Sequence, residues 1–157
     1  MAVWLMKSEP DEFSIDDLKR LGKANWDGVR NYQARNFMRD MSLGDQILFY
    51  HSSCKVPGIV GTSRVSKTAH PDPSCWDESS PYYDAKSTES SPRWDQVELT
   101  YESKFTFPIT LSAMKNMAGL EGFSLIQKGS RLSVMPVAQN YLDVLGENSS
   151  HFKQTPA

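Results

Sequence analysis

The chain has few of the residues that mark metal-binding, secreted or membrane proteins. Its 157 residues include two cysteines, Cys54 and Cys75, whose spacing matches no metal-binding motif. Near the N-terminus a lysine follows the apolar residues instead of preceding them, which is the wrong order for a secretory signal. We therefore expect free thiols and a cytoplasmic protein, or a nuclear one if the source is eukaryotic. No stretch approaches the ~18 apolar residues of a membrane helix, so we expect no membrane partner.

The chain also lacks a strong net charge. Its formal net charge is -2 at pH 7, whereas domains that bind duplex phosphate across a broad surface usually have a pI above ~9. A nucleic-acid ligand would have to be held mainly by a pocket, or by few phosphate contacts. With 39% hydrophobic and 23% charged residues, the composition is that of an ordinary globular protein, and the length fits one domain.

Strands dominate the predicted secondary structure. We expect strands at 3–7, 46–50, 59–65 and 132–135, and one or two long strands between 97 and 109. We expect helices after Ser14, at 32–41, at 112–117 and from Pro136 onward. The order lacks the βαβ alternation of a parallel sheet, so we predict an α+β fold with a small, mostly antiparallel barrel flanked by short helices. We place the domain at 1–146 and expect a frayed tail at 147–157.

Several local signals support these boundaries. Ser14 suits a helix N-cap, with Asp17 at the third helical position and Gly22 at the end of the helix. The apolar residues from Val97 to Ile109 fall on odd positions, which is the period of a strand with one buried face. A glycine inside the strand at 59–65 indicates a bulge or a close approach of two backbones.

A long stretch from Ser66 to Trp94 shows almost no periodicity. Loops of this length in a compact domain are usually functional or disordered. This one contains Trp76, Tyr82 and Tyr83, which are too many aromatic residues for a disordered linker. We therefore expect an ordered loop that covers a ligand pocket.

The segment Trp26-Asp27-Gly28-Val29-Arg30-Asn31 places an aromatic ring, a glycine and an amide close together before a predicted helix. A pocket for a planar heterocycle needs a ring to stack on its face and an amide to read its edge. Trp26 could be an ordinary core residue, but it lies in a predicted loop outside any periodic stripe, which favours binding over folding. Asn31 could read a base edge or cap the following helix.

Further segments extend this pattern along nearly the whole chain. They include Trp4-Leu5-Met6-Lys7-Ser8-Glu9-Pro10, Phe49-Tyr50-His51-Ser52, Pro57-Gly58-Ile59-Val60-Gly61, Tyr82-Tyr83-Asp84, Pro92-Arg93-Trp94 and Arg131-Leu132-Ser133-Val134. In this order they resemble the EVE domain of the PUA-like superfamily, which includes bacterial stand-alone EVE proteins. The family usually has Tyr or Phe where this chain has His70, a departure outside the proposed pocket.

The resemblance implies a PUA-like β pseudo-barrel with a base pocket on one side. It also implies a relationship to YTH domains, which bind N6-methyladenine in RNA. The function it implies is non-catalytic binding of a modified nucleobase, such as methylated or hydroxymethylated cytosine in DNA, or a modified base in RNA. It implies no catalytic residue, and we expect no cofactor and no metal.

The resemblance and the residue types together give a set of candidate base-binding residues. They are Trp26, Asn31, Ser8, Glu9, Tyr50, His51, Ser52 and Trp94. Glu9 could accept a hydrogen bond from an exocyclic amine, or belong only to a turn. His51 could be a pocket wall or a buried structural histidine. Trp94 could be a second aromatic wall, flanking the same base as Trp26, or an anchor for the long loop.

Basic residues could form a rim that contacts phosphate. The candidates are Lys7, Arg30, Arg35, Lys55, Arg93 and Arg131, although each by itself could be just a solvated charge.

Two other classes of function compete with base binding. An enzyme could use His51 and Glu9, but the sequence has no clear nucleophile–base pair and no cluster of carboxylates suited to a metal. A domain for a metabolite or another small molecule could use the same pocket, and the net acidity of the chain fits that function better than it fits nucleic acid.

Overall fold

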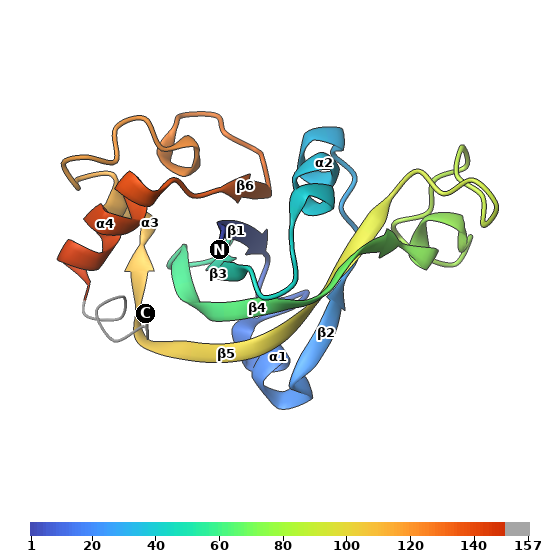
Figure 1. Cartoon of the computed structure of the whole chain (residues 1–157), viewed down its shortest axis with the longest axis horizontal. Coiled ribbons are helices and arrows are strands. Elements are labelled where there is room, and N and C mark those ends of the chain that lie inside the picture. The colour runs from blue at the N-terminus through green and yellow to red at the C-terminus, as the bar shows by residue number, and fades with distance from the viewer. Residues whose placement is uncertain (150–157) are drawn as a thin grey trace.

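The polypeptide folds around one curved, six-stranded sheet with helices on both sides of it (Figure 1). The computed structural model describes residues 1–149. The strands are β1 (Val3–Ser8), β2 (Lys23–Trp26), β3 (Gln46–His51), β4 (Gly58–Pro71), β5 (Asp95–Thr110) and β6 (Val134–Pro136). The helices are α1 (Ile15–Leu21), α2 (Tyr32–Asp40), α3 (Leu111–Met114) and α4 (Gln139–Asn148), with 3-10 turns η1 (Pro73–Trp76) and η2 (Ser124–Ile126).

The order of strands across the sheet is β2-β5-β4-β3-β1-β6. β1 runs parallel to β3, and the other pairings are antiparallel. The predicted α+β class and the mostly antiparallel arrangement are therefore confirmed. Within residues 1–149 the sheet is not closed, because β2 and β6 each have one partner and form its two edges.

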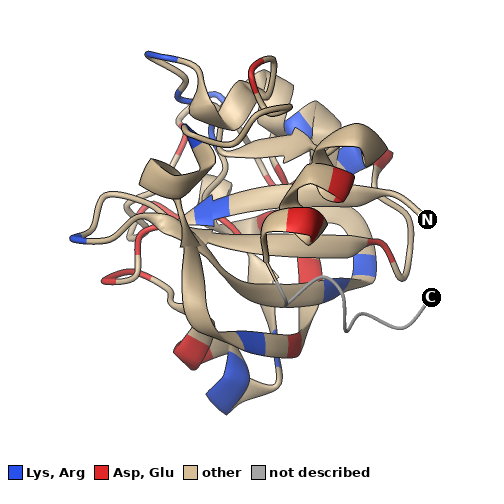
Figure 2. Ribbon diagram, turned by 90° about the vertical axis from the view of Figure 1, so that its left-hand side faces the viewer, with Lys and Arg blue, Asp and Glu red and all other residues tan. Residues whose placement is uncertain are grey.

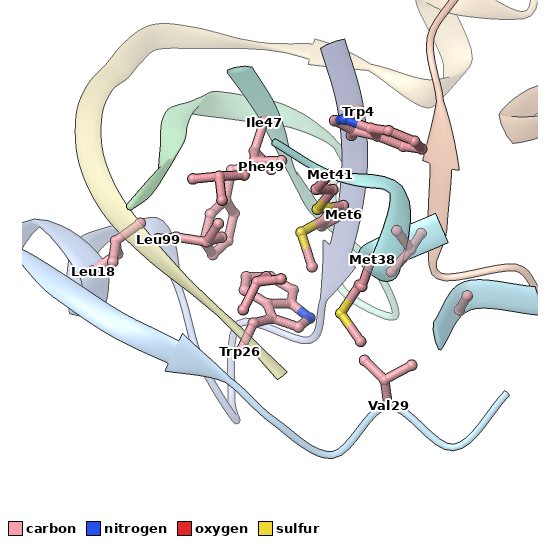
Figure 3. Close-up of a cluster of buried hydrophobic side chains, with 14 of the residues drawn as sticks. Trp4, Met6, Leu18, Trp26, Val29, Met38, Met41, Ile47, Phe49 and Leu99 are labelled. Carbon is pink, nitrogen blue, oxygen red and sulfur yellow. The ribbon is translucent and has the colours of Figure 1, made fainter. Parts of the chain in front are cut away.

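Both faces of the sheet are covered by buried side chains. Alternation along β1 and β3 sends Met6 and Phe49 to one face, where they join residues of α1 and α2 (Figure 3). The intervening residues Leu5 and Leu48 face the other way and pack with residues from α3, α4 and the segment from Leu120 to Leu125. Central strands buried on both faces read as continuous apolar runs, which is how β3 looks in the sequence.

The predicted signals around α1 are confirmed. Ser14 accepts a hydrogen bond from the Asp17 backbone N–H, and the Asp17 carboxylate accepts one from the Ser14 N–H. Gly22 ends the helix with φ of 82°. The bulge expected inside β4 is also present: a Cβ on Gly61 would lie 2.2 Å from the Ser103 carbonyl oxygen. Only a glycine allows the two backbones to approach this closely.

The predicted start of the long loop is wrong. β4 continues past Ser66 to Pro71, with His70 paired to Gln96 of β5. Register shifts after Val65 and after Lys67 add unpaired residues to this part of β4, and these bulges hide the period of two from the sequence.

The period of β5 is broken in the same way. Phe107, predicted to face the core, is 74% exposed. Between the pairs Gly61↔Lys104 and Ile59↔Ile109, β5 has more residues than β4, so residues 106–108 bulge away from the core while Phe105 stays buried.

The C-terminal elements begin and end a few residues away from their predicted positions. Pro136 ends β6 instead of starting the last helix, which begins at Gln139. α4 continues through Asn148, so residues 147 and 148 belong to the helix and not to a frayed tail. Ser149 follows the helix as its C-cap, and residues 150–157 of the predicted tail lie outside the described residues.

Candidate functional site

A pocket of about 690 Å³ opens where the ends of β1 and β2 meet the long loop; we call it the Trp26 pocket. Its lining comes from segments far apart in the sequence. The residues are Lys7, Ser8, Glu9, Glu12, Phe13, Asn25, Trp26, Asp27, Gly28, Val29, Arg30, Ser52, Ser53, Tyr82, Ser130, Arg131 and Ser133. Four of the predicted base-binding residues are therefore brought together: Ser8, Glu9, Trp26 and Ser52.

Trp26 bounds the pocket and belongs to the core at the same time. It is the last residue of β2, is 9% exposed, and lies beside Phe49 in the core (Figure 3). Its ring makes near-perpendicular contacts with the rings of Phe49 at 5.2 Å and Phe13 at 6.3 Å. The predicted loop position of Trp26 is wrong, because pairing with β5 places Trp26 in the sheet. Its role in base binding stays a prediction.

Tyr82 forms a wall of the pocket against the Gly28 backbone. Gly28 has φ of 78°, and a Cβ there would lie 2.8 Å from the Tyr82 ring. The Tyr82 hydroxyl donates to Glu12 at 3.4 Å. In the sequence, Tyr82 is one of the aromatic residues of the long loop and was not predicted to belong to the site. The glycine at position 28 could have indicated that another group packs closely here, since a glycine often marks a close approach of the backbone to a neighbour.

Carboxylates give the pocket an acidic side. Glu9, Glu12 and Asp27 all contribute to its lining. Partial burial raises the pKa of Asp27, and the nearby negative charge of Asp72 raises it further. Ionised carboxylates only accept hydrogen bonds, so these groups suit a ligand that presents N–H donors, such as the exocyclic amine of cytosine.

A buried ion pair holds the long loop against this pocket. Asp72, fully buried, accepts hydrogen bonds from the Gly28 N–H at 2.9 Å, from Arg30 Nη1 at 3.0 Å, and from both the N–H and the hydroxyl of Ser74. Burial alone would raise the pKa of Asp72, but these hydrogen bonds outweigh it and lower the pKa. Arg30 also donates from Nε to the Tyr82 carbonyl at 2.9 Å. Arg30 therefore lines the pocket, but its donors are committed to positioning the loop.

Tyr50 and His51 lie outside the residues that line the Trp26 pocket. His51 Nε2 accepts a hydrogen bond from the Ile15 N–H at 3.1 Å and so satisfies the first free donor of α1. Burial lowers the pKa of His51, which favours the neutral ring that this contact requires. Tyr50 points to the opposite face of the sheet, and burial raises its pKa to about 12. Ser52 follows β3 directly and lines the pocket.

Asn31 and Trp94 likewise support neighbouring structure. Asn31 Oδ1 accepts from the Ala34 N–H at 2.9 Å and caps α2. Trp94 stacks on Tyr32 at 4.7 Å and donates from Nε1 to Asp84 at 2.8 Å. β5 begins one residue after Trp94, and its residue Val97 pairs with Trp26, so Trp94 lies beyond the pocket beside α2.

The predicted basic rim is divided between two places. Lys7 and Arg131 line the Trp26 pocket, whereas Lys55 is exposed and does not. Arg35 and Arg93 lie at the stack formed by Tyr32 and Trp94. Arg35 Cζ is 4.8 Å from the Tyr32 ring centre, and Arg93 donates to the Tyr32 hydroxyl and pairs with Asp84 at 3.6 Å.

The described residues meet the requirements of neither a metal site nor a disulfide. Among residues 1–149, no group of three or more His, Cys, Asp or Glu side chains is placed to hold a metal ion. Cys54 and Cys75 are free thiols. In the part of the chain that the structure describes, no helix is long and apolar enough to span a bilayer.

Comparisons with known proteins agree with one another. Residues 2–147 match the family model described as EVE domain. Thymocyte nuclear protein 1 from Mus musculus is 42% identical over 161 residues, which cover 90% of this chain and 71% of that protein. A solved structure from Pseudomonas syringae has 52% identity and a TM-score of 0.91, covering 94% of this chain and 99% of that one. The human THYN1 protein "in complex with 5-methylcytosine containing DNA" has 36% identity and a TM-score of 0.89, covering 99% of this chain and 100% of that one.

Proposed function

Because this chain belongs to the EVE domain family, we propose that the Trp26 pocket binds a single modified nucleobase of DNA without transforming it. One observation carries the proposal: the rings of Trp26 and Tyr82 line a pocket to which Glu9, Glu12 and Asp27 contribute hydrogen-bond acceptors. The solved human relative, in complex with DNA that contains 5-methylcytosine, supports a methylated cytosine as the first ligand to test.

The chemistry of the pocket fits a base better than an extended chain. Stacking of one base on an aromatic side chain contributes ~1–3 kcal/mol, and both Trp26 and Tyr82 are available for it. The carboxylates of Glu9 and Asp27 would accept the amine of a cytosine, while thymine presents an oxygen at the same place. A base must leave a duplex stack to enter such a pocket, so single-stranded or unpaired DNA should bind best.

Two observations support binding over catalysis. His51 has no free nitrogen to act as a general base, because its Nε2 already accepts a hydrogen bond from the Ile15 N–H of α1. Relatives with high coverage include a protein in complex with DNA, and nothing in their names refers to a reaction. A nuclear location for eukaryotic relatives fits their name, while the cytoplasmic location of this chain stays a prediction.

A small-molecule function remains the second candidate, on the strength of the acidic lining. Glu9, Glu12 and Asp27 would repel a free nucleotide phosphate at the pocket itself but accept an amine-bearing metabolite.

Calorimetric titration with nucleosides tests the proposal directly. We expect saturable binding of 5-methyl-2′-deoxycytidine, weaker binding of 2′-deoxycytidine and thymidine, and no chemical change in the ligand by mass spectrometry. Conversion of a nucleoside would support an enzyme, and absence of binding to all three would support a metabolite domain.

Two adjacent tyrosines provide a matched pair of variants for this titration. Tyr82→Ala removes a pocket wall and should weaken binding about fivefold or more. Tyr83→Ala removes a neighbouring ring that is 41% exposed and outside the pocket, and it should bind as the wild type does. Equal effects of the two substitutions would place the ligand elsewhere.

A further inference from the structure

A second depression of about 580 Å³ adjoins the Trp26 pocket; we call it the lysine groove. The two share four lining residues, so they form one continuous hollow: Lys7, Ser52, Ser53 and Ser130. Beyond them, the lysine groove is bounded by Lys115 after α3 and by the segment from Leu125 to Gly129. The groove is therefore built mainly from the C-terminal third of the chain, which contributes little to the Trp26 pocket.

The two hollows differ in charge. Three lysines line the groove, Lys7, Lys115 and Lys128, and none of its lining residues is Asp or Glu. The Trp26 pocket has a mixed lining, with the carboxylates of Glu9, Glu12 and Asp27 beside the basic residues Lys7, Arg30 and Arg131. In the ribbon view of Figure 2, basic and acidic residues are interspersed along the chain. A ligand that lies across both hollows would have an amine-bearing part in one and an anionic part in the other.

We propose that the lysine groove binds the phosphodiester backbone next to the base in the Trp26 pocket, so that the site reads one base of a DNA strand together with its flanking phosphate. This inference rests on the proposed function. It assigns the phosphate contacts to Lys7, Lys115 and Lys128 in place of Lys55, Arg35 and Arg93, which lie outside both hollows.

The surroundings of Lys7 suit a residue at the junction. It is half-buried, and this burial lowers its pKa. Its Nζ lies 5.9 Å from the centre of the Tyr50 ring, whose own pKa is raised to about 12 by burial. Tyr50 therefore stays uncharged at neutral pH, and Lys7 has no carboxylate partner among the described residues. An arriving phosphate would supply the missing counter-charge.

The wall of the groove is held in place before any ligand arrives. Gln127 donates hydrogen bonds from Nε2 to the Glu121 carbonyl at 2.6 Å and to the Phe123 carbonyl at 3.2 Å. Leu125 is buried in the core beneath this segment. Preorganised cations lose less conformational entropy on binding an anion than cations on a mobile loop.

Two probes separate this inference from the proposed function. The first is the nucleoside 5-methyl-2′-deoxycytidine, which carries no phosphate. The second is a single-stranded oligonucleotide with one 5-methylcytosine. The variant is Lys115→Gln with Lys128→Gln, and the control is Lys67→Gln with Lys86→Gln, which removes the same charge from exposed lysines outside both hollows.

We expect the Lys115/Lys128 variant to bind the oligonucleotide about fivefold or more weakly, with a log–log salt slope reduced by roughly 0.7 for each lost phosphate contact. Its nucleoside affinity and thermal midpoint should match those of the wild type, and the control should change neither affinity. Unchanged oligonucleotide binding, or equal loss for both probes, would overturn the inference. Failure of the wild type to bind the nucleoside would instead overturn the proposed function, and this inference with it.

Discussion

Replacing Gly28 by alanine should damage both the fold and the site, for two reasons that can be measured separately. The residue has φ of 78°, where an L side chain costs roughly 1–2 kcal/mol. The new Cβ would also lie 2.8 Å from the Tyr82 ring. Carbon atoms pack best at ~3.5–4.0 Å, so the ring must retreat by roughly 0.7 Å or more. The backbone cost lowers stability, and the retreat displaces a wall of the Trp26 pocket.

Gly44 provides a matched control for the backbone cost. It has φ of 84°, and a Cβ there would meet nothing within 4 Å. Gly44→Ala should therefore show the backbone cost alone, or about 2–8 °C in the thermal midpoint of a domain of this size, with unchanged nucleoside affinity. Gly28→Ala should lower the midpoint further and weaken binding about fivefold or more.

A double variant tests whether Tyr82 is the cause. In Gly28→Ala with Tyr82→Ala the clash is gone, so the two changes should cost less stability together than the sum of their separate effects. Calorimetry gives the midpoints, and titration with 5-methyl-2′-deoxycytidine gives the affinities. If Gly28→Ala and Gly44→Ala proved equal in both measurements, the contact between Gly28 and Tyr82 would have no energetic consequence and our account of this wall would be refuted.

Three further substitutions probe the pocket and its support. Trp26→Ala should lower the free energy of unfolding by ~3–5 kcal/mol in chemical denaturation, as expected for a core tryptophan, and a much smaller loss would contradict this core role. Trp26→Phe should keep the fold while weakening nucleoside binding. Burial raises the pKa of Asp27 above its ordinary 3.8, so the folded state resists ionisation and loses stability as pH rises through the folded pKa. Asp27→Asn should accordingly raise the thermal midpoint at pH 7, with the gain vanishing below about pH 3.8, while nucleoside binding weakens; an unchanged midpoint at pH 7 would argue against the shift. Hydrogen bonds lower the pKa of Asp72, so the carboxylate stabilises the fold at neutral pH and this stabilisation is lost as pH falls through the folded pKa. Asp72→Ala should lower the free energy of unfolding by ~3–5 kcal/mol and increase protease cleavage near Tyr82. Unchanged protease resistance in this variant would show that the ion pair does not hold the loop.

Features that depend on neighbours in the chain could be predicted from the sequence. Ser14, Asp17 and Gly22 form a cap and a stop through backbone hydrogen bonds that need no tertiary partner. The strands β1 and β3 follow from apolar residues that are adjacent in the chain. Even Gly61 was informative, because a missing side chain inside a strand signals that another backbone passes close by.

Errors arose where distant segments decide the role of a residue. Trp26 looked like a loop residue because β2 has only four residues, and pairing with β5 makes it a strand. Trp94 looked like the partner of Trp26, yet it stacks on Tyr32. β4 extends through its bulges only because β5 is there to pair with them. In each case the local sequence allowed two environments, and the tertiary contact chose between them.

The sequence by itself determined the family and the strand-rich architecture, because motifs and periodicity are local properties of the chain. Only the tertiary structure decided which residues line the pocket. The Tyr82 ring lies on Gly28, His51 is committed to α1, and Asp72 ties the long loop to both Gly28 and Arg30. Such contacts join segments that are remote in the chain, and neither composition nor spacing records which remote group will meet a given side chain once the sheet has formed.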